Sequence, residues 1–113
     1  MNMNNERVSK LPSAEEARAE SNLTILTRQE NIKDNAFTFL NTKVLKAREE
    51  ASAIGRFEAE VIMQPHYYGV DQRLYCDTIT NELRRLNYEV TVSDYNNGSV
   101  NAKKLHFSWF NKN

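Results

Sequence analysis

The sequence predicts an α+β fold in which N-terminal helices, one of them long, precede a strand–helix–strand–strand module with a three-stranded antiparallel sheet. Three observations predict this class. Residues 13–54 contain no glycine or proline and repeat apolar side chains at helical spacing. Residues 57–63 alternate apolar and polar side chains, which is typical of a half-buried strand. Asn97 and Gly98 form the turn of a hairpin, because both central positions of such a turn need a positive φ.

The length and the charge balance limit the classes of function. A chain of 113 residues is predicted to form one domain, residues 13–113, after a polar and flexible arm at 1–12. Basic and acidic residues number 15 each, and neither half of the chain is basic. Binding to nucleic acid or to an anionic membrane needs clustered Lys and Arg, so we expect neither partner. A single cysteine, Cys76, excludes an internal disulfide.

The helical half begins at a capping box. In this motif the side chains of Ser13 and Glu16 each accept a hydrogen bond from the backbone amide of the other residue. We expect a short helix from there to about Ser21. Ser, Asn and Thr side chains over 21–24 compete for backbone hydrogen bonds, so the sequence predicts a break at that point. A long helix then covers 27–54, and Gly55 ends it, because glycine adopts the left-handed conformation at no cost.

The length of this helix predicts self-assembly. A helix over 27–54 is about 42 Å long at ~1.5 Å per residue, whereas a seven-residue strand spans about 23 Å. The helix therefore extends beyond the sheet, and the simplest partner for the excess is a second copy of the chain. Its stripe is close to a heptad and comprises Ile25, Ile32, Ala36, Leu40, Val44, Ala47, Ala51 and Ile54. The predicted interface residues are Ile25, Ile32, Phe37, Leu40 and Leu45. The alternative is a helix packed only on its own sheet, with Leu45 exposed.

Each element of the C-terminal module has its own signal. The strand at 57–63 presents Phe57, Ala59, Val61 and Met63 on one face. Asp71 caps a helix that runs to about Leu86, and its buried stripe is Tyr75, Ile79, Leu83 and Leu86. Strands follow at 88–92 and 103–110, and the last presents Leu105, Phe107 and Trp109 to the helices, so we expect Trp109 to be largely buried.

The strand order follows from the connections. The hairpin makes the second and third strands antiparallel neighbours, and the helix between the first and second strands makes those two run in the same direction. The order 1-3-2 places the most apolar strand in the centre and makes every pairing antiparallel. The alternative order, 1-2-3, needs a parallel pair in a very small sheet, and parallel pairs are usually covered on both faces.

Three short segments resemble a class of small proteins of tailed phages and their prophages. They are residues 53–57 at the end of the long helix, residues 83–88 at the end of the next helix, and Phe107, Ser108 and Trp109 in the last strand. That class carries Gly more often than Asn at the position of Asn87, and Ile where this chain has Phe107. The resemblance covers about residues 13–110. It implies a phage origin and a helix-plus-sheet fold, and it supplies no catalytic residue.

Residue types that carry chemistry are few and scattered. His66, Cys76 and His106 are not spaced as metal ligands, and the sequence contains no phosphate-binding glycine pattern. We therefore expect no catalytic residue, no metal and no cofactor, and we interpret the chain as non-enzymatic. The best candidate for a ligand or partner site is the loop with His66, Tyr67 and Tyr68, to which Arg84 and Arg85 could add anion contacts. In the alternative, a tyrosine of this loop only closes the edge of the core.

The function hypothesis combines these points. We expect a phage structural or accessory interaction protein, a homo-oligomer and concretely a capsid-associated component of the virion, that contacts itself and another phage or host protein. The alternative is an anti-defence protein that binds a small nucleotide signal or inhibits a host protein. Either hypothesis places the protein in the host cytoplasm, and the first also places it in the virion.

Overall fold

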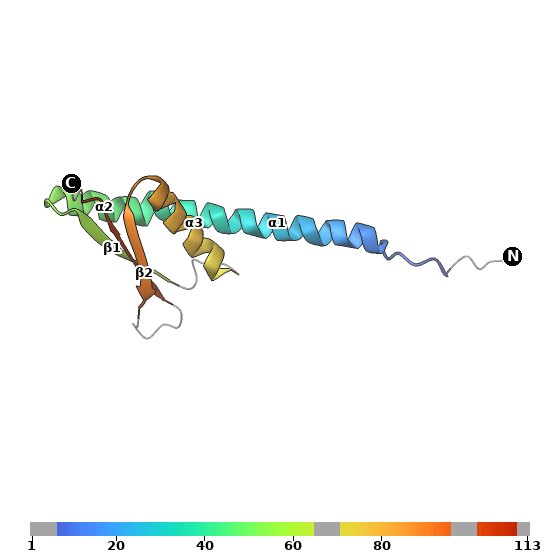
Figure 1. Cartoon of the computed structure of the whole chain (residues 1–113). Coiled ribbons are helices and arrows are strands. Elements are labelled where there is room, and N and C mark those ends of the chain that lie inside the picture. Colours follow the sequence, from blue (N-terminus) through green and yellow to red (C-terminus); the bar gives the residue numbers. More distant parts are fainter. Residues whose placement is uncertain (1–6, 65–70, 96–101, 111–113) are drawn as a thin grey trace.

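The computed structural model describes residues 7–64, 71–95 and 102–110 of the chain. The predicted α+β class is confirmed: one long helical rod and a shorter helix lie beside a three-stranded antiparallel sheet (Figure 1). The rod comprises α1 (Ala14–Phe39), the π-helix η2 (Leu40–Val44) and α2 (Leu45–Ala53). Strand β1 (Glu58–Met63), helix α3 (Gln72–Arg85), strand β2 (Glu89–Asp94) and strand β3 (Lys103–Ser108) follow.

Strand β3 lies in the centre of the sheet, so the predicted order 1-3-2 is confirmed. Both pairings are antiparallel, and Phe107 of β3 lies opposite Ala59 of β1 and Val90 of β2. The α2 helix contacts β1, while α3 contacts α1 and β2, so the helices cover one face of the sheet. The other face carries Glu58, Glu60 and His106 among its polar side chains.

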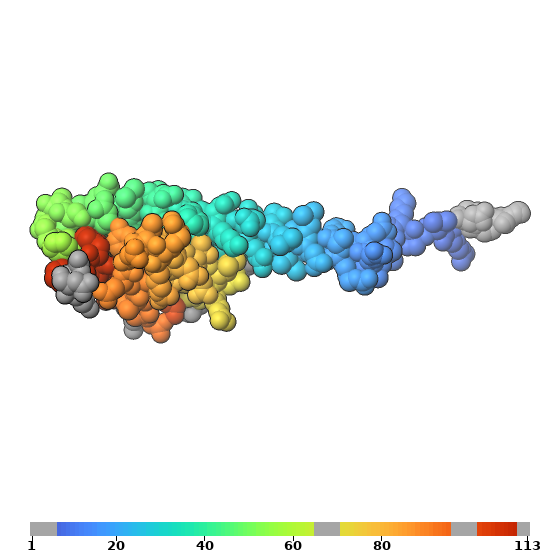
Figure 2. All heavy atoms as spheres, turned by 45° about the horizontal axis from the view of Figure 1, so that its top comes forward, coloured from blue at the N-terminus to red at the C-terminus, as the bar shows by residue number. Residues whose placement is uncertain are grey.

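The first half of α1 extends away from the rest of the molecule. Every residue from 14 to 31 is exposed, and we call this segment the overhang. Figure 2 shows it as a single helix without neighbours from the described chain. The radius of gyration is 22.0 Å, whereas a compact domain of this length has about 13 Å. The predicted excess of helix over sheet is therefore real, and it lies at the N-terminal end.

The predicted break at 21–24 is wrong, because α1 runs without interruption through this segment. The hydroxyl of Thr24 donates to the carbonyl of Glu20 at 3.1 Å, and that of Thr27 donates to Leu23 at 2.9 Å. These side chains therefore bond within the helix rather than competing with it. The capping box is present as predicted: the amide of Glu16 donates to the Ser13 hydroxyl at 3.1 Å, and the Ser13 amide donates to Glu16 at 3.0 Å.

Both helical segments that precede a strand end in the same backbone motif. Gly55 has a φ of +78°, its amide donates to Ser52, and the amide of Arg56 donates to Ala51. Asn87 has a φ of +71° and starts the equivalent pair of bonds after α3. This is the Schellman arrangement, in which two amides satisfy carbonyls at the helix end. The predicted stops at Gly55 and Asn87 are thus confirmed.

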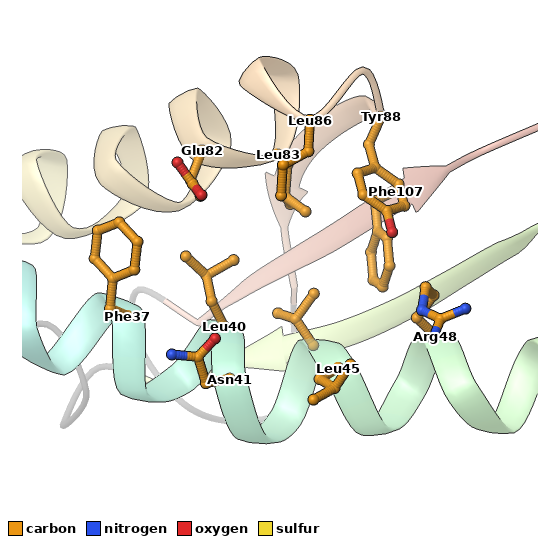
Figure 3. Close-up of a pocket in the computed structure, with 11 residues that line it drawn as sticks. Phe37, Leu40, Asn41, Leu45, Arg48, Glu82, Leu83, Leu86, Tyr88 and Phe107 are labelled. Carbon is orange, nitrogen blue, oxygen red and sulfur yellow. The ribbon is translucent and has the colours of Figure 1, made fainter.

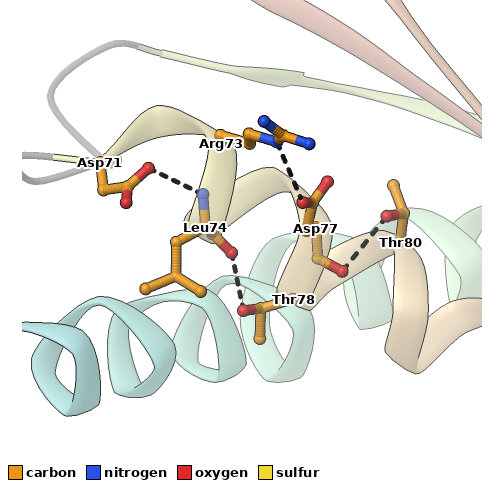
Figure 4. A network of polar contacts seen from close by, with 6 residues as sticks. All are labelled: Asp71, Arg73, Leu74, Asp77, Thr78 and Thr80. Atoms are coloured by element: carbon orange, nitrogen blue, oxygen red, sulfur yellow. Dashed lines mark hydrogen bonds and ion pairs between the residues drawn. The ribbon is translucent and has the colours of Figure 1, made fainter.

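Polar contacts fix the first turns of α3 (Figure 4). As predicted, Asp71 caps the helix by accepting the amide of Leu74 at 3.0 Å. The hydroxyl of Thr78 donates to the carbonyl of Leu74 at 2.7 Å, and Arg73 lies 3.8 Å from the carboxylate of Asp77. These polar side chains therefore bond within α3 itself. The apolar side chains of Tyr75 and Ile79 point from the helix into the core.

The π-helix explains why the predicted stripe stays buried from Ile32 to Ala51. On an uninterrupted helix of ~3.6 residues per turn, Lys43 and Glu50 would share a face with Ile32. In the structure Lys43 and Glu50 are exposed, whereas Val44 and Ala51 are buried. The amide of Leu45 donates to the carbonyl of Leu40, five residues earlier, so η2 accommodates one extra residue. This extra residue rotates the following helix and keeps its charged side chains out of the core.

Deleting one residue from η2 tests this interpretation. Deletion of Thr42, which is exposed, should convert the segment to ordinary α-helix and change the free energy of unfolding by less than about 1 kcal/mol. Deletion of Asn35, also exposed, is the matched control. It rotates Ile32 out of the core and should cost about 2 kcal/mol or more. Chemical denaturation followed by circular dichroism measures both values, and equal losses would contradict the role of η2.

Four further predictions about the core need correction. Phe39 is buried although it was not assigned to the stripe, and Ile25 and Ile54 are exposed although they were. Phe57 precedes β1 and is exposed, because its ring packs against the edge of Phe110 rather than under the helices. Leu86 is exposed because it is the cap of α3, where the space between α3 and the rod opens to solvent. Trp109 is only partly buried, and its ring contacts Tyr88 and Phe107.

Candidate functional site

The structure separates the predicted interface residues into two groups. Ile32 and Leu40 belong to the core of the chain itself, where they pack with residues of α3 and the sheet. The fold already covers both side chains, and Leu40 also lines the groove described next. Ile25, Phe37 and Leu45 are exposed and remain available to a partner.

An apolar groove lies between the rod and the C-terminal end of α3; Phe37 lies opposite Glu82 at one end of it, and Leu86 lies beside Leu83 further along (Figure 3). The hollow has a volume of about 160 Å³, similar to cavities of ~150 Å³ that admit benzene. Its floor is formed by core side chains, and its rim by exposed ones. The lining residues are Phe37, Leu40, Asn41, Val44, Leu45, Arg48, Glu82, Leu83, Leu86, Tyr88 and Phe107.

The overhang adds a second set of apolar side chains. Leu23, Ile25 and Leu26 are 65%, 53% and 58% exposed; Leu23 and Leu26 share one side of α1, and Ile25 lies on the side of Ile32. Single exposed apolar residues are common on protein surfaces, but a cluster on an isolated helix is not. The groove, Leu23 and Leu26 together form a candidate surface for binding another protein chain.

Sequence reasoning did not find the groove, because it depends on Leu86 lying beside the rod. The sequence places Leu86 in the buried stripe of its helix, and only the three-dimensional packing shows it at the surface. A signal for part of the surface was present in the sequence. Ala19, Leu23 and Leu26 repeat at spacings of four and three residues, and Phe37 falls on the same repeat further along α1.

Of the predicted ligand site, only Arg84 and Arg85 lie among the described residues. His66, Tyr67 and Tyr68 lie outside the described residues. Arg85 binds both carboxylate oxygens of Glu82, at 2.8 and 2.7 Å. This hydrogen bonding lowers the pKa of Glu82 and raises the pKa of Arg85. Arg84 lies at a separate shallow hollow with Cys76 and Lys103. The two arginines are therefore not brought together at one anion site.

The charged groups on the open face of the sheet are paired with one another. His106 lies there, as predicted, and its Nε2 is 3.0 Å from a carboxylate oxygen of Glu58. This hydrogen bond lowers the pKa of Glu58, whereas a general acid needs a raised one. Glu60 lies 3.5 Å from the amine of Lys104. The two carboxylates therefore form cross-strand pairs with basic side chains.

Cys76 has the features of a structural thiol. It is partly buried beside the core, and this burial is the main cause that raises its pKa. A nucleophilic cysteine needs a lowered pKa, because the thiolate is the reactive form. Among residues 7–64, 71–95 and 102–110, no group of His, Cys, Asp and Glu side chains is arranged to hold a metal ion.

Comparisons with known proteins give no family: no protein-family model matches the chain, and searches of curated proteins and of solved structures yield no significant match. In the described part of the chain, no helix combines the length and hydropathy that a membrane crossing requires.

Proposed function

We propose that this chain is a non-enzymatic interaction protein that self-associates through its long helix, as a structural or accessory component of a tailed phage. The observation that carries the proposal is the overhang, a helix of residues 14–31 whose side chains are all exposed. Most of the stability of helices in proteins comes from packing of one face, and the overhang packs against no described residue of its own chain. A partner that covers Leu23 and Leu26 supplies the free energy that the rest of the chain does not.

The chemistry of the described residues also supports an interaction protein. The carboxylates of Glu58, Glu60 and Glu82 are paired with basic side chains, and the pKa of Cys76 is raised. An extended apolar surface on one helix and its adjoining groove suits contact with another protein. The phage setting and the place in the virion rest on the sequence resemblance alone.

No geometry in the described residues favours the alternative of a nucleotide-binding anti-defence protein. That alternative needs basic and aromatic side chains that converge on one ligand. Arg85 is held by Glu82, and Arg84 lies at a different hollow. We therefore pursue self-association.

The mass of the full chain in solution tests the proposal. We expect sedimentation velocity and light scattering at about 1 to 500 µM to show a multiple of the 13.1 kDa monomer, with dissociation on dilution. A species that stays at the monomer mass at the highest concentration would contradict self-association. Mass spectrometry of purified virions tests the second part: many copies per particle support a virion component, and absence from the particle contradicts it.

A further inference from the structure

A continuous row of exposed side chains runs along α1 on the side next to the groove. Its members are spaced alternately by four and three residues, which is the pattern of a coiled-coil seam. All are exposed, and they differ from the core stripe of Ile32, Ala36 and Phe39. We call this row the seam, and it comprises Ala19, Leu23, Leu26, Glu30, Lys33 and Phe37.

The seam leads directly into the groove. Phe37 is the last residue of the seam and also lines the hollow, where its ring points towards α3 (Figure 3). Beyond η2, Leu45 continues the row on the same side of the rod. The row therefore runs from the apolar side chains of the overhang, past the charged pair Glu30 and Lys33, to the apolar groove at Phe37. A helix that follows the seam would lie in the groove as it passes α3.

The two charged residues in the middle of the seam select an orientation. Glu30 and Lys33 lie 3.9 Å apart on the surface of one chain, with side chains 69% and 47% exposed. In a parallel pair of helices, each would face the same residue of the second copy, so like charges would meet. In an antiparallel pair with its two-fold axis midway between them, Glu30 of each copy faces Lys33 of the other. Charge complementarity therefore favours the antiparallel pair.

The lengths agree with this arrangement. An axis midway between Glu30 and Lys33 places residues 14–31 of one copy against residues 32–49 of the other. The first segment is the overhang, and the second is the part of the rod that carries the groove. Leu26 then meets Phe37, and Leu23 meets Leu40, which lines the hollow. Each overhang covers the groove of the other copy, and the two contacts are identical by symmetry.

We propose that two copies of this chain pair antiparallel through α1, so that the overhang of each fills the groove of the other. This arrangement rests on the proposed self-association and specifies it. Leu23 and Leu26 are the side chains that enter the groove. The pair of Glu30 and Lys33 sets the register, because any shift along the seam would bring these charges against apolar side chains.

Charge reversal tests the register. In the full chain, Glu30→Lys and Lys33→Glu should each weaken the dimer about tenfold or more, because each single change places like charges together twice. The double variant restores opposite charges across the axis and should bind within about threefold of the wild type. Glu20→Lys, which lies off the seam, is the matched control and should leave the dimer unchanged. Sedimentation at several concentrations gives the dissociation constants. A dimer that none of these variants weakens would overturn the proposed register.

A separate pair of variants tests the groove contact. Leu23→Asp should shift the chain to monomer, whereas Thr24→Asp, one position away and off the seam, should not. Both residues are exposed, so the fold of the monomer should survive. The circular dichroism spectrum and thermal unfolding of each variant check that it does. If both variants dissociate equally, or neither does, Leu23 does not fill the groove.

Spin labelling determines the orientation independently. A label on Asn22→Cys in a Cys76→Ser background should give a distance near 28 Å along the rod in an antiparallel dimer, at ~1.5 Å per residue. A parallel dimer would place the two labels about 10 Å apart. The short distance would overturn the antiparallel arrangement while leaving self-association intact. A chain that remains monomeric would overturn both proposals.

Discussion

Replacing Ile32 by aspartate is expected to unfold the chain rather than to separate subunits. Ile32 is 4% exposed and packs in the core with Phe39 and the buried residues of α3. A carboxylate at this position has no basic partner among the neighbouring core side chains, so its burial should cost about 3–5 kcal/mol. The measurement is guanidinium denaturation followed by circular dichroism, at one protein concentration because self-association adds to apparent stability.

Ile25→Asp is the control for this result. Ile25 lies two turns earlier on the same side of α1, but it is 53% exposed and belongs to the overhang. Its replacement should lower the stability of the folded monomer by about 0.5 kcal/mol or less. Similar losses for the two variants would show that Ile32 is not in the core.

The second large effect concerns Phe107 in the central strand. Its side chain is 0% exposed, and its ring lies 5.9 Å from that of Tyr88 and 5.8 Å from that of Trp109. Phe107→Ala should lower the free energy of unfolding by about 3–5 kcal/mol, because it removes the ring and leaves a cavity between sheet and helices. The midpoint of chemical denaturation should fall without a change in its slope.

Two aromatic neighbours serve as comparisons for Phe107. Phe110 is 53% exposed and contacts Phe57 edge to face at 5.5 Å, so Phe110→Ala should cost about 1.5 kcal/mol or less. Trp109 is partly buried, and Trp109→Ala should fall between the two. If Phe110→Ala costs as much as Phe107→Ala, the centre of the core does not lie at Phe107.

The parts of the fold that depend on local chemistry could be predicted from the sequence. The caps at Ser13 and Asp71, the stops at Gly55 and Asn87, and the strand order all follow from residue types and short spacings. The continuous helix through 21–24 could not, because threonine hydroxyls can bond either inside or outside a helix. Propensity alone does not decide between these two outcomes.

The candidate surface was predictable only in outline. The excess length of the helix predicted that some of it lacks cover, and the structure confirms this for the overhang. Which side chains remain exposed depends on the phase of the helix relative to α3 and the sheet. One extra residue in η2 changes that phase, so Ile32 and Leu40 turn inwards, and Leu45 stays at the groove. In the sequence, its trace is the run of three consecutive spacings of four from Ile32 through Ala36 and Leu40 to Val44.

The π-helix has a consequence for the history of the chain. Because η2 absorbs one residue while Ile32 and Ala51 both stay in the core, a gene that gained or lost a codon here would encode the same packing on either side. π-bulges inside helices behave as such single-residue insertions. Related chains can therefore differ in length between Phe39 and Leu45 without differing in architecture. A gap-free alignment across this helix would pair the wrong residues in one of its halves.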